Sequence, residues 1–555
     1  MDTHVAARHA ATRSGHVQKR THRLLAQGED QIVQRRTFLA TGLAALATLG
    51  PSATLSRGKL PAAPTHAPKA SKNAIARFVR QRAKELARRA FVPPVETPAP
   101  LAAMGYDAYR DLRFRPERAI WRGKNLGFEL QFFVSAYIYR SAVDIFLVDN
   151  GSIRRLSADR DLFDFGPQDG KVPRNAPLHF SGFRIHAPLK RPDYYDELLA
   201  FQGASYFRGL GKHHSYGLSA RALALSTEGP EPEEFPLFRS FWIERPKDQS
   251  ALTVHGLLDS PSVTGAYTFV IAPGAATVMD VEAQIFPRRD LPKVGLAPLT
   301  SMFLKATHDG DGPPDFRPAI HDSGALAAWN GADERLWRPL LSPPELQMSC
   351  FRDRSPKGFG LIQRERHFDA YQDLEAHYQD RPSAWVEPKG DWGDGCVQLI
   401  EIPTQAEYFD NIVAAWRPDK TLHAGHTYSI GYRLSWCDDT PAWRGYRVGA
   451  TRIGEGSRPG TVRFVIDFLD PRATKPEQVA SVGVTDAPLR PLPEAVISAG
   501  AGLTGPALMQ RNDVSGGIRA TFELDPQGHK ESELRLALVA DGQPASEVWL
   551  FRWRR

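Results

Sequence analysis

The chain has 555 residues, of which 42% are hydrophobic and 10% aromatic, and this is enough to bury the cores of two or more domains. The composition excludes a small disulfide scaffold, a collagen-like fibre and a disordered chain. The net charge of +7 lies within residues 1–70, so residues 71–555 sum to zero. A neutral body lacks the basic surface that nucleic-acid binding needs, and we expect no nucleic-acid partner.

The first 70 residues resemble an export leader. Arg35 and Arg36 precede a weakly apolar stretch of small residues over 40–49, the pattern of a twin-arginine signal. This stretch is shorter than the ~20 residues that cross a bilayer, so we expect no stable membrane insertion after signal removal. We therefore predict that residues 1–70 are a signal peptide and leader with an unplaced cleavage site, and that the protein is exported to the periplasm. An amphipathic cytosolic arm is the alternative.

The body begins with a predicted helix and continues with predicted strands. Apolar residues recur at helical spacing over 73–91, and Pro93-Pro94 ends that pattern. From Trp121 onward the apolar period changes to two, which indicates half-buried strands. Turn clusters such as Asp149-Asn150-Gly151-Ser152 separate these strands at the spacing of antiparallel meanders. We predict a large β-sandwich domain over 71–437.

A second strand-rich block follows a break at Asp438-Asp439-Thr440-Pro441. Its strands alternate over 462–468, 518–524, 534–538 and 548–553, and its length of ~105 residues is typical of an immunoglobulin-like sandwich. We predict a linker over 438–449 and an immunoglobulin-like domain over 450–555. The expected fold class is mainly β, with a large antiparallel β-sandwich domain followed by a smaller immunoglobulin-like β-sandwich domain.

The sequence offers little sign of a metal, cofactor or disulfide framework. It contains no complete phosphate-binding loop, no G-x-S-x-G elbow and no H-E-x-x-H motif. Its three cysteines, Cys350, Cys396 and Cys437, lack metal-ligand spacing. We expect buried free thiols with one disulfide at most, and neither a cofactor nor a metal.

Tryptophan is concentrated in one part of the chain. Seven of the eleven tryptophans lie within 115 residues, interleaved with carboxylates: Trp329, Trp337, Trp385, Trp392, Trp416, Trp436 and Trp443. Aromatic rings beside acids and amides are typical of a sugar site, because apolar sugar faces stack on rings and hydroxyls need fixed acceptors. The alternative is that these rings fill the core of a wide sandwich.

Ten short segments together resemble one protein family, and they follow the order of that family. They are Gly203–Arg208, Tyr216–Arg221, Glu234–Pro236, Leu258–Ser260, Gly265–Tyr267, Ala297–Phe303, Ile320–Ser323, Pro356–Leu361, Arg381–Pro388 and Asp410–Val413. On these segments the chain resembles the periplasmic glucan biosynthesis proteins G and D over nearly all of its mature length. The twin-arginine leader makes it most similar to the D branch.

The resemblance implies a protein that acts on osmoregulated periplasmic glucans, which have a β-1,2-linked glucose backbone. It implies the same two-domain β architecture, and membership among inverting glycoside hydrolases that cut β-1,2-glucan internally. Inverting hydrolysis needs one carboxyl group as general acid and another as general base. By resemblance Asp410 is the general acid, Asp322 is the general base, and Tyr378 lies beside the path of the water.

Other residues of the matched region are expected to bind the substrate. Glu407, Glu387 and Arg381 are predicted to contact sugar hydroxyls or to support the acidic pair, and Trp385, Trp392 and Trp329 to stack on sugar rings. Structural roles are the alternatives for the catalytic candidates: a helix N-cap for Asp322, a turn residue for Asp410 and a core aromatic for Tyr378. The acidic stretch Gly390–Gly395 departs from the family pattern, so the subsite preference is open.

Two functions from different classes therefore compete. The first is an inverting endo-β-1,2-glucanase that shapes the glucan backbone. The alternative is a non-catalytic glucan-binding or scaffolding partner of the membrane glucosyltransferase that extends the chain. A lectin-like protein for another β-glucan ranks third. The hydrolase requires Asp322 and Asp410 to face one another across a single cleft.

Overall fold

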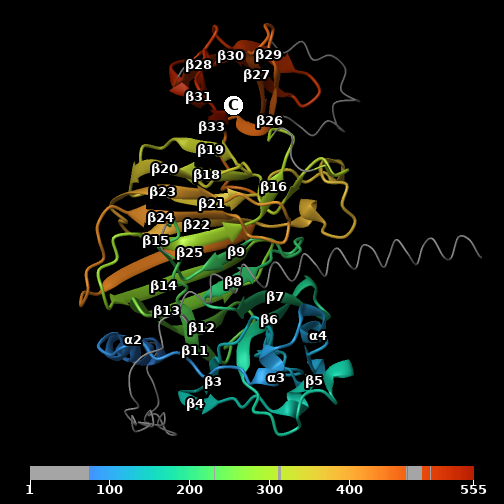
Figure 1. Ribbon diagram of the computed structural model, residues 1–555, viewed down its shortest axis with the longest axis vertical. Helices are drawn as coiled ribbons and strands as arrows, with labels where there is room; N and C mark the ends of the chain where they lie inside the picture. Colours follow the sequence, from blue (N-terminus) through green and yellow to red (C-terminus); the bar gives the residue numbers. More distant parts are fainter. Residues whose placement is uncertain (1–73, 230–231, 310–313, 471, 473–490, 501) are drawn as a thin grey trace, which may run out of the picture.

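Figure 1 shows the computed structural model, which describes residues 74–229, 232–309, 314–470, 472, 491–500 and 502–555. The predicted leader lies outside the described residues. Strands dominate the described chain and nearly all of them pair antiparallel, so the mainly β prediction is confirmed. No described helix is long and apolar enough to span a membrane.

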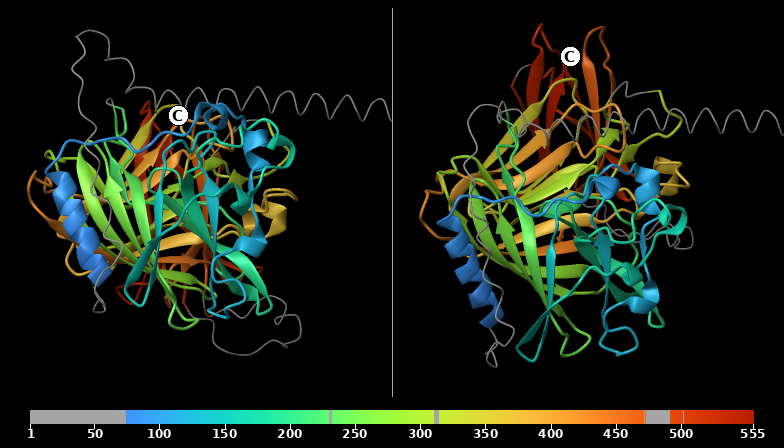
Figure 2. Two further views of the ribbon diagram at one scale, coloured as in Figure 1. Left: turned by 90° about the horizontal axis from the view of Figure 1, so that it is seen from below. Right: turned by 60° about the horizontal axis from the view of Figure 1, so that its bottom comes forward.

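One amphipathic helix precedes the strands. Helix α2 (Ala74–Ala87) buries Ile75, Val79 and Ala83, which recur at helical spacing. This buried face packs on Phe146 and Trp242 against one large sheet, and Figure 2 shows α2 lying along the outside of that sheet. The predicted helix is confirmed over most of its length. The shorter helical elements are α3 (Ala99–Ala102), α4 (Tyr106–Arg110) and the 3-10 turns Pro116–Arg118, Arg160–Leu162, Gly166–Gln168, Phe368–Ala370 and Tyr378–Asp380.

Two large sheets make up most of the described chain (Figure 1). The ten-stranded sheet has the order β2 (Glu129–Val134), β6 (Phe180–Arg191), β7 (Tyr194–Gln202), β8 (Tyr206–Gly209), β9 (Ser219–Arg221), β15 (Val294–Ser301), β24 (Ile412–Pro418), β23 (Asp394–Glu401) and β20 (Gln347–Arg354), with β10 (Leu223–Leu225) paired to β15.

The fifteen-stranded sheet has the order β28 (Glu494–Ala499), β31 (Glu531–Ala540), β33 (Val548–Arg554), β19 (Arg335–Pro339), β18 (Ala325–Trp329), β21 (Gly358–Ile362), β22 (Ser383–Lys389), β25 (Tyr428–Cys437), β14 (Thr277–Pro287), β13 (Val263–Ala272), β12 (Leu252–Asp259), β11 (Leu237–Glu244), β3 (Asp144–Asp149) and β4 (Ser152–Arg155), with β32 (Gln543–Pro544) paired to β31. Two small sheets pair β1 (Arg113–Phe114) with β5 (Phe163–Asp164), and β16 (Phe303–Lys305) with β17 (Ile320–His321).

The main hydrophobic core joins the two large sheets. Phe183 and Phe201 of the ten-stranded sheet contact Phe241 and Phe269 of the fifteen-stranded sheet, with ring centroids 5.0 and 5.2 Å apart for the pairs 183–241 and 201–269. Phe269 alternates with more exposed residues along β13, as on a half-buried strand, whereas Phe183, Phe201 and Phe241 lie in runs of buried residues.

The C-terminal strands continue the fifteen-stranded sheet. Strand β33 runs parallel to β19, pairing Leu336 with Val548 and Trp337 with Trp549. A four-stranded sheet, β26 (Arg447–Glu455), β27 (Val462–Leu469), β30 (Gly517–Leu524) and β29 (Leu508–Asn512), shares one core with these strands. Strand β25 ends at Cys437 and β26 begins at Arg447, and the division at 438–449 stays a prediction.

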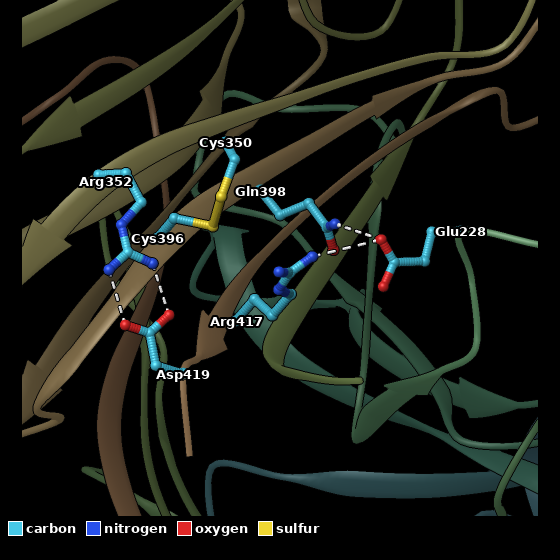
Figure 3. Close-up of a disulfide and its surroundings, with 7 residues drawn as sticks. All are labelled: Glu228, Cys350, Arg352, Cys396, Gln398, Arg417 and Asp419. Carbon is cyan, nitrogen blue, oxygen red and sulfur yellow. Dashed lines mark hydrogen bonds and ion pairs between the residues drawn. A yellow bond between two sulfur atoms is a disulfide. The ribbon is translucent and has the colours of Figure 1, made fainter. Parts of the chain in front are cut away.

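A disulfide fastens the edge of the ten-stranded sheet (Figure 3). It joins Cys350 of the edge strand β20 to Cys396 of β23. Arg352 of β20 forms a bidentate ion pair with Asp419, which follows β24, with N–O distances of 2.5 and 2.7 Å. Cys437 is a free thiol. One disulfide and one free thiol lie within the range that the cysteine spacing allowed.

Candidate active site

Backbone hydrogen bonds hold the segments of the two candidate catalytic aspartates against one short stretch of chain at the end of β15. The backbone amide of Asp322 donates to the carbonyl oxygen of Met302 at 2.9 Å. The amide of Asn411, which follows Asp410, donates to the carbonyl oxygen of Ser301 at 3.0 Å. Three of the matched segments therefore converge here, and they bring two aspartates that are distant in sequence to the same place.

Buried side chains fix this convergence. The amide group of Asn411, which is 1% exposed, accepts a hydrogen bond from Phe303 N at 2.8 Å and donates to Phe303 O at 2.9 Å. The hydroxyl of Ser301 donates to that of Ser323 at 2.8 Å. Hydrogen bonds on both flanks leave little freedom to the backbones of Asp322 and Asp410, which is what a preorganised site requires.

Asp322 sits in an environment that favours its protonated form. The pKa of Asp322 is raised to about 6: burial is the largest cause, the charges of Asp410 and Glu407 also raise it, and the charges of Arg381 and Arg208 lower it. The guanidinium Nε of Arg381 lies 3.5 Å from Asp322 Oδ1. A carboxyl group with a pKa near neutrality can exchange a proton under physiological conditions, which general acid–base catalysis demands.

Asp410 is more exposed than Asp322 and lies near a buried arginine. Burial alone would lower the pKa of Arg221, but Tyr206, Glu233 and Asp410 outweigh burial and raise it. Arg221 Nη1 lies 2.6 Å from Glu233 Oε1, so its charge is already paired. Asp410 acts electrostatically on Asp322 as well as on Arg221, so the three side chains lie near one another.

Tyr378 connects the acidic pair to Glu407. Its hydroxyl donates to Glu407 Oε2 at 2.9 Å. Burial, together with the charges of Glu407 and Asp322, raises the pKa of Tyr378 above its ordinary range, so the phenol stays protonated. The side chain of Gln363 donates to His321 O at 2.9 Å and to Tyr378 O at 3.0 Å, which ties the Tyr378 turn to the residue before Asp322.

Arg317 completes the cluster from another loop. Its Nη1 donates to the same Glu407 Oε2 at 2.7 Å and to Asp373 Oδ2 at 2.6 Å. Sequence reasoning missed Arg317 and Asp373, because they lie outside the matched segments and only the fold brings their loops together. It also missed Asn411 and Arg208, although both stand inside matched segments and could have been chosen there.

Five predicted residues meet in this cluster: Asp322, Asp410, Tyr378, Glu407 and Arg381. Glu387 does not join them. It lies six residues after Arg381 along an extended chain that advances ~3.3 Å per residue, so β22 carries it away from the cluster. There it pairs in register with Arg433 of β25. Among the described residues no group of His, Cys, Asp and Glu side chains is arranged to hold a metal ion.

The three chosen tryptophans lie elsewhere. Trp385 is 2% exposed, so it offers no face to a sugar, and we correct its role to a core side chain. Trp329 is half-buried at the far end of β18, where its ring nitrogen donates to Asp333 at 2.6 Å. Trp392 packs against Tyr432, with ring centroids 6.2 Å apart. The core interpretation also holds for Trp416 and Trp436, which are both 0% exposed.

Known proteins resemble this chain over most of its length. The family described as "Periplasmic glucan biosynthesis protein, MdoG" matches residues 76–553. The chain is 48% identical to glucans biosynthesis protein G of Rhodopseudomonas palustris over 86% of this chain and 92% of that protein. It is 46% identical to protein G of Shewanella frigidimarina over 85% of this chain and 83% of that protein.

A third relative, glucans biosynthesis protein G of Vibrio cholerae, is 45% identical over 85% of both chains. These relatives carry the name of protein G, so the similarity to the D branch in particular stays a prediction from the leader. The family resemblance deduced from the ten segments is confirmed. The chain belongs to the periplasmic glucan biosynthesis protein family, MdoG, whose members take part in glucan biosynthesis.

Proposed function

We propose that this protein is an inverting endo-hydrolase of β-1,2-glucan that trims the backbone during periplasmic glucan biosynthesis. Asp410 donates a proton to the glycosidic oxygen of the leaving chain. Asp322 accepts a proton from a water molecule, whose oxygen attacks the anomeric carbon from the opposite face of the sugar. The products are two shorter glucans, and the newly formed reducing end has inverted configuration.

One observation carries the proposal: hydrogen bonds to the neighbouring residues Met302 and Ser301 bring Asp322 and Asp410 to one place. Burial there raises the pKa of Asp322 to about 6. Two carboxyl groups in one site, one of them able to exchange a proton near neutral pH, are what this reaction requires. The Tyr378 hydroxyl donates to Glu407 and lies near Asp322, on the side where the resemblance puts the attacking water.

A pKa near neutrality suits an acid as well as a base, so the assignment of the two roles follows from the resemblance. Chemical rescue separates them. Without its general acid, the enzyme should keep activity on an aryl β-glycoside whose phenolate needs no proton. Without its general base, Asp322→Ala should regain activity with azide and form the glycosyl azide of inverted configuration.

The decisive experiment incubates purified protein with linear β-1,2-glucan and follows new reducing ends and their first-formed anomer. Wild type should release α-configured ends from the β-linked chain, and Asp322→Asn and Asp410→Asn should release none. Glu387→Gln is the matched control, because it removes a carboxylate from a strand outside the cluster. Saturable glucan binding by a wild type that releases no reducing ends would favour the non-catalytic partner of the membrane glucosyltransferase.

A further inference from the structure

Three loops meet at Arg317. Its guanidinium contacts Asp315 of its own loop, Asp373 of the loop before Tyr378, and Glu407 of the loop before Asp410, with N–O distances of 2.8, 2.6 and 2.7 Å. The side chain of Arg317 is 13% exposed. A largely buried guanidinium with three carboxylates holds the backbones of these loops within the reach of one side chain.

Each of these loops carries a large apolar side chain beside its ion-paired residue. Phe316 precedes Arg317 and is 82% exposed, Leu374 follows Asp373 and is 79% exposed, and Tyr408 follows Glu407 and is 42% exposed. We call Phe316, Leu374 and Tyr408 the apolar rim. Exposed apolar side chains of this size therefore stand on all three loops that the guanidinium of Arg317 joins, and exposed apolar side chains close to one another mark a binding surface.

Continuity with the acidic cluster indicates which occupant fits. Glu407 Oε2, which binds Arg317, is also the acceptor of the Tyr378 hydroxyl, so Glu407 links the loops of the rim to the candidate active site. Arg317 is fully used by carboxylates and offers no free cation to an anionic ligand. An apolar surface beside a neutralised charge suits the C–H faces of uncharged pyranose rings.

We propose that the apolar rim binds glucosyl units of the β-1,2-glucan chain beyond the bond that is cut, a function that the buried tryptophans cannot perform. This inference rests on the proposed function, because the chain that lies on the rim is the substrate of the acidic pair. The rim residues bind substrate and take no part in proton transfer.

The test measures binding apart from catalysis. In the Asp410→Asn background, calorimetric titration with linear β-1,2-glucan longer than ten units should show affinity about tenfold weaker after Phe316→Ala or Tyr408→Ala. Affinity for a disaccharide should not change, because it does not extend to the rim. Tyr408→Phe should bind like the parent, since it keeps the ring. Tyr194→Ala, a 61% exposed tyrosine at the β6–β7 turn, is the matched control.

The outcomes separate this inference from the hydrolase proposal. If wild type releases no reducing ends but the rim variants still bind long glucan more weakly, the rim stands and the hydrolase fails. In the opposite case wild type cuts glucan, but the variants Phe316→Ala, Leu374→Ala and Tyr408→Ala bind long glucan like the parent. The role of the rim in binding is then overturned and the hydrolase proposal stands. In active protein the rim variants should raise KM while kcat changes by less than about twofold.

Discussion

The guanidinium Nε of Arg381 lies 3.5 Å from Oδ1 of Asp322, and both side chains are largely buried. Arg381 is itself held in place, since the Arg366 side chain donates to its carbonyl oxygen. Its positive charge favours the ionised form of Asp322 and partly offsets the burial that raises the pKa of this carboxyl to about 6. Arg381 therefore sets the pH at which Asp322 becomes a base.

Arg381→Gln should shift the pH profile of glucan hydrolysis. Loss of the guanidinium removes the opposing charge, so the pKa of Asp322 rises above about 6. If ionised Asp322 is the base, the acidic limb of kcat/KM moves to higher pH by about one unit. Initial rates between pH 4 and 9 measure this limb. Arg433→Gln, which breaks the exposed pair with Asp280 on β14, should leave it in place. An unchanged limb in Arg381→Gln would contradict the role of Asp322.

Asp322 should also make stability depend on pH. Its pKa is about 6 in the folded state, against an ordinary value of 3.8 for an aspartate, so between these values the folded state binds more protons than the unfolded state. The free energy of unfolding therefore falls as pH rises from about 4 to about 6 and is level above that range. The cost at neutral pH is at most about 3 kcal/mol.

Asp322→Asn should therefore raise the free energy of unfolding at pH 8 relative to wild type, with a much smaller difference at pH 4. Urea titrations at the two pH values, followed by tryptophan fluorescence, measure this difference. Asp391→Asn, at an exposed carboxylate on the β22–β23 turn, is the control and should show no such gain at pH 8. Equal effects of Asp322→Asn at both pH values would show that burial does not perturb this carboxyl.

Strand positions could be predicted from the sequence because alternation is a local property of each strand. The same alternation does not say which strands pair. The parallel pair of β19 with β33 joins residues more than two hundred positions apart, and nothing in either strand specifies its neighbour. For this reason the continuation of the fifteen-stranded sheet into the C-terminal strands was not foreseen.

The residues of the candidate site also divide into those that a local motif predicts and those that only the fold brings together. Asp322 and Asp410 were found because each stands in a short motif. The choice of Trp385 failed because a motif does not reveal which face of β22 a side chain occupies, and its ring lies over Gly358 and Gly360 in the core. Arg317 and the apolar rim were invisible, since their loops are joined only by ion pairs between distant residues.

A buried ion-pair network should hold the C-terminal strands to the large sheets. Arg364, which follows β21, bonds Asp439 at 2.9 Å and Glu547 at 2.8 Å, and its side chain is 8% exposed. Arg364→Met leaves both carboxylates without this partner, so the free energy of unfolding should fall by about 3–5 kcal/mol. Urea titration followed by tryptophan fluorescence measures it. Arg352→Met at the exposed Asp419 pair should cost much less, because water screens that pair. Equal losses in both variants would contradict the network.

The disulfide should stabilise the fold without being required for it. Cys350 and Cys396 enclose a separation of 46 residues, for which the loop-entropy relation gives about 4 kcal/mol as an upper value. The double variant Cys350→Ser/Cys396→Ser should lose about 2–4 kcal/mol of unfolding free energy and keep its fold at low temperature, because the β20–β23 ladder remains. Urea titrations with and without dithiothreitol measure the effect. Reductant should lower the urea concentration at the unfolding midpoint equally for wild type and for Cys437→Ser. It should leave the midpoint of the double variant unchanged. A double variant that still responded to reductant would show that another thiol carries the stabilisation.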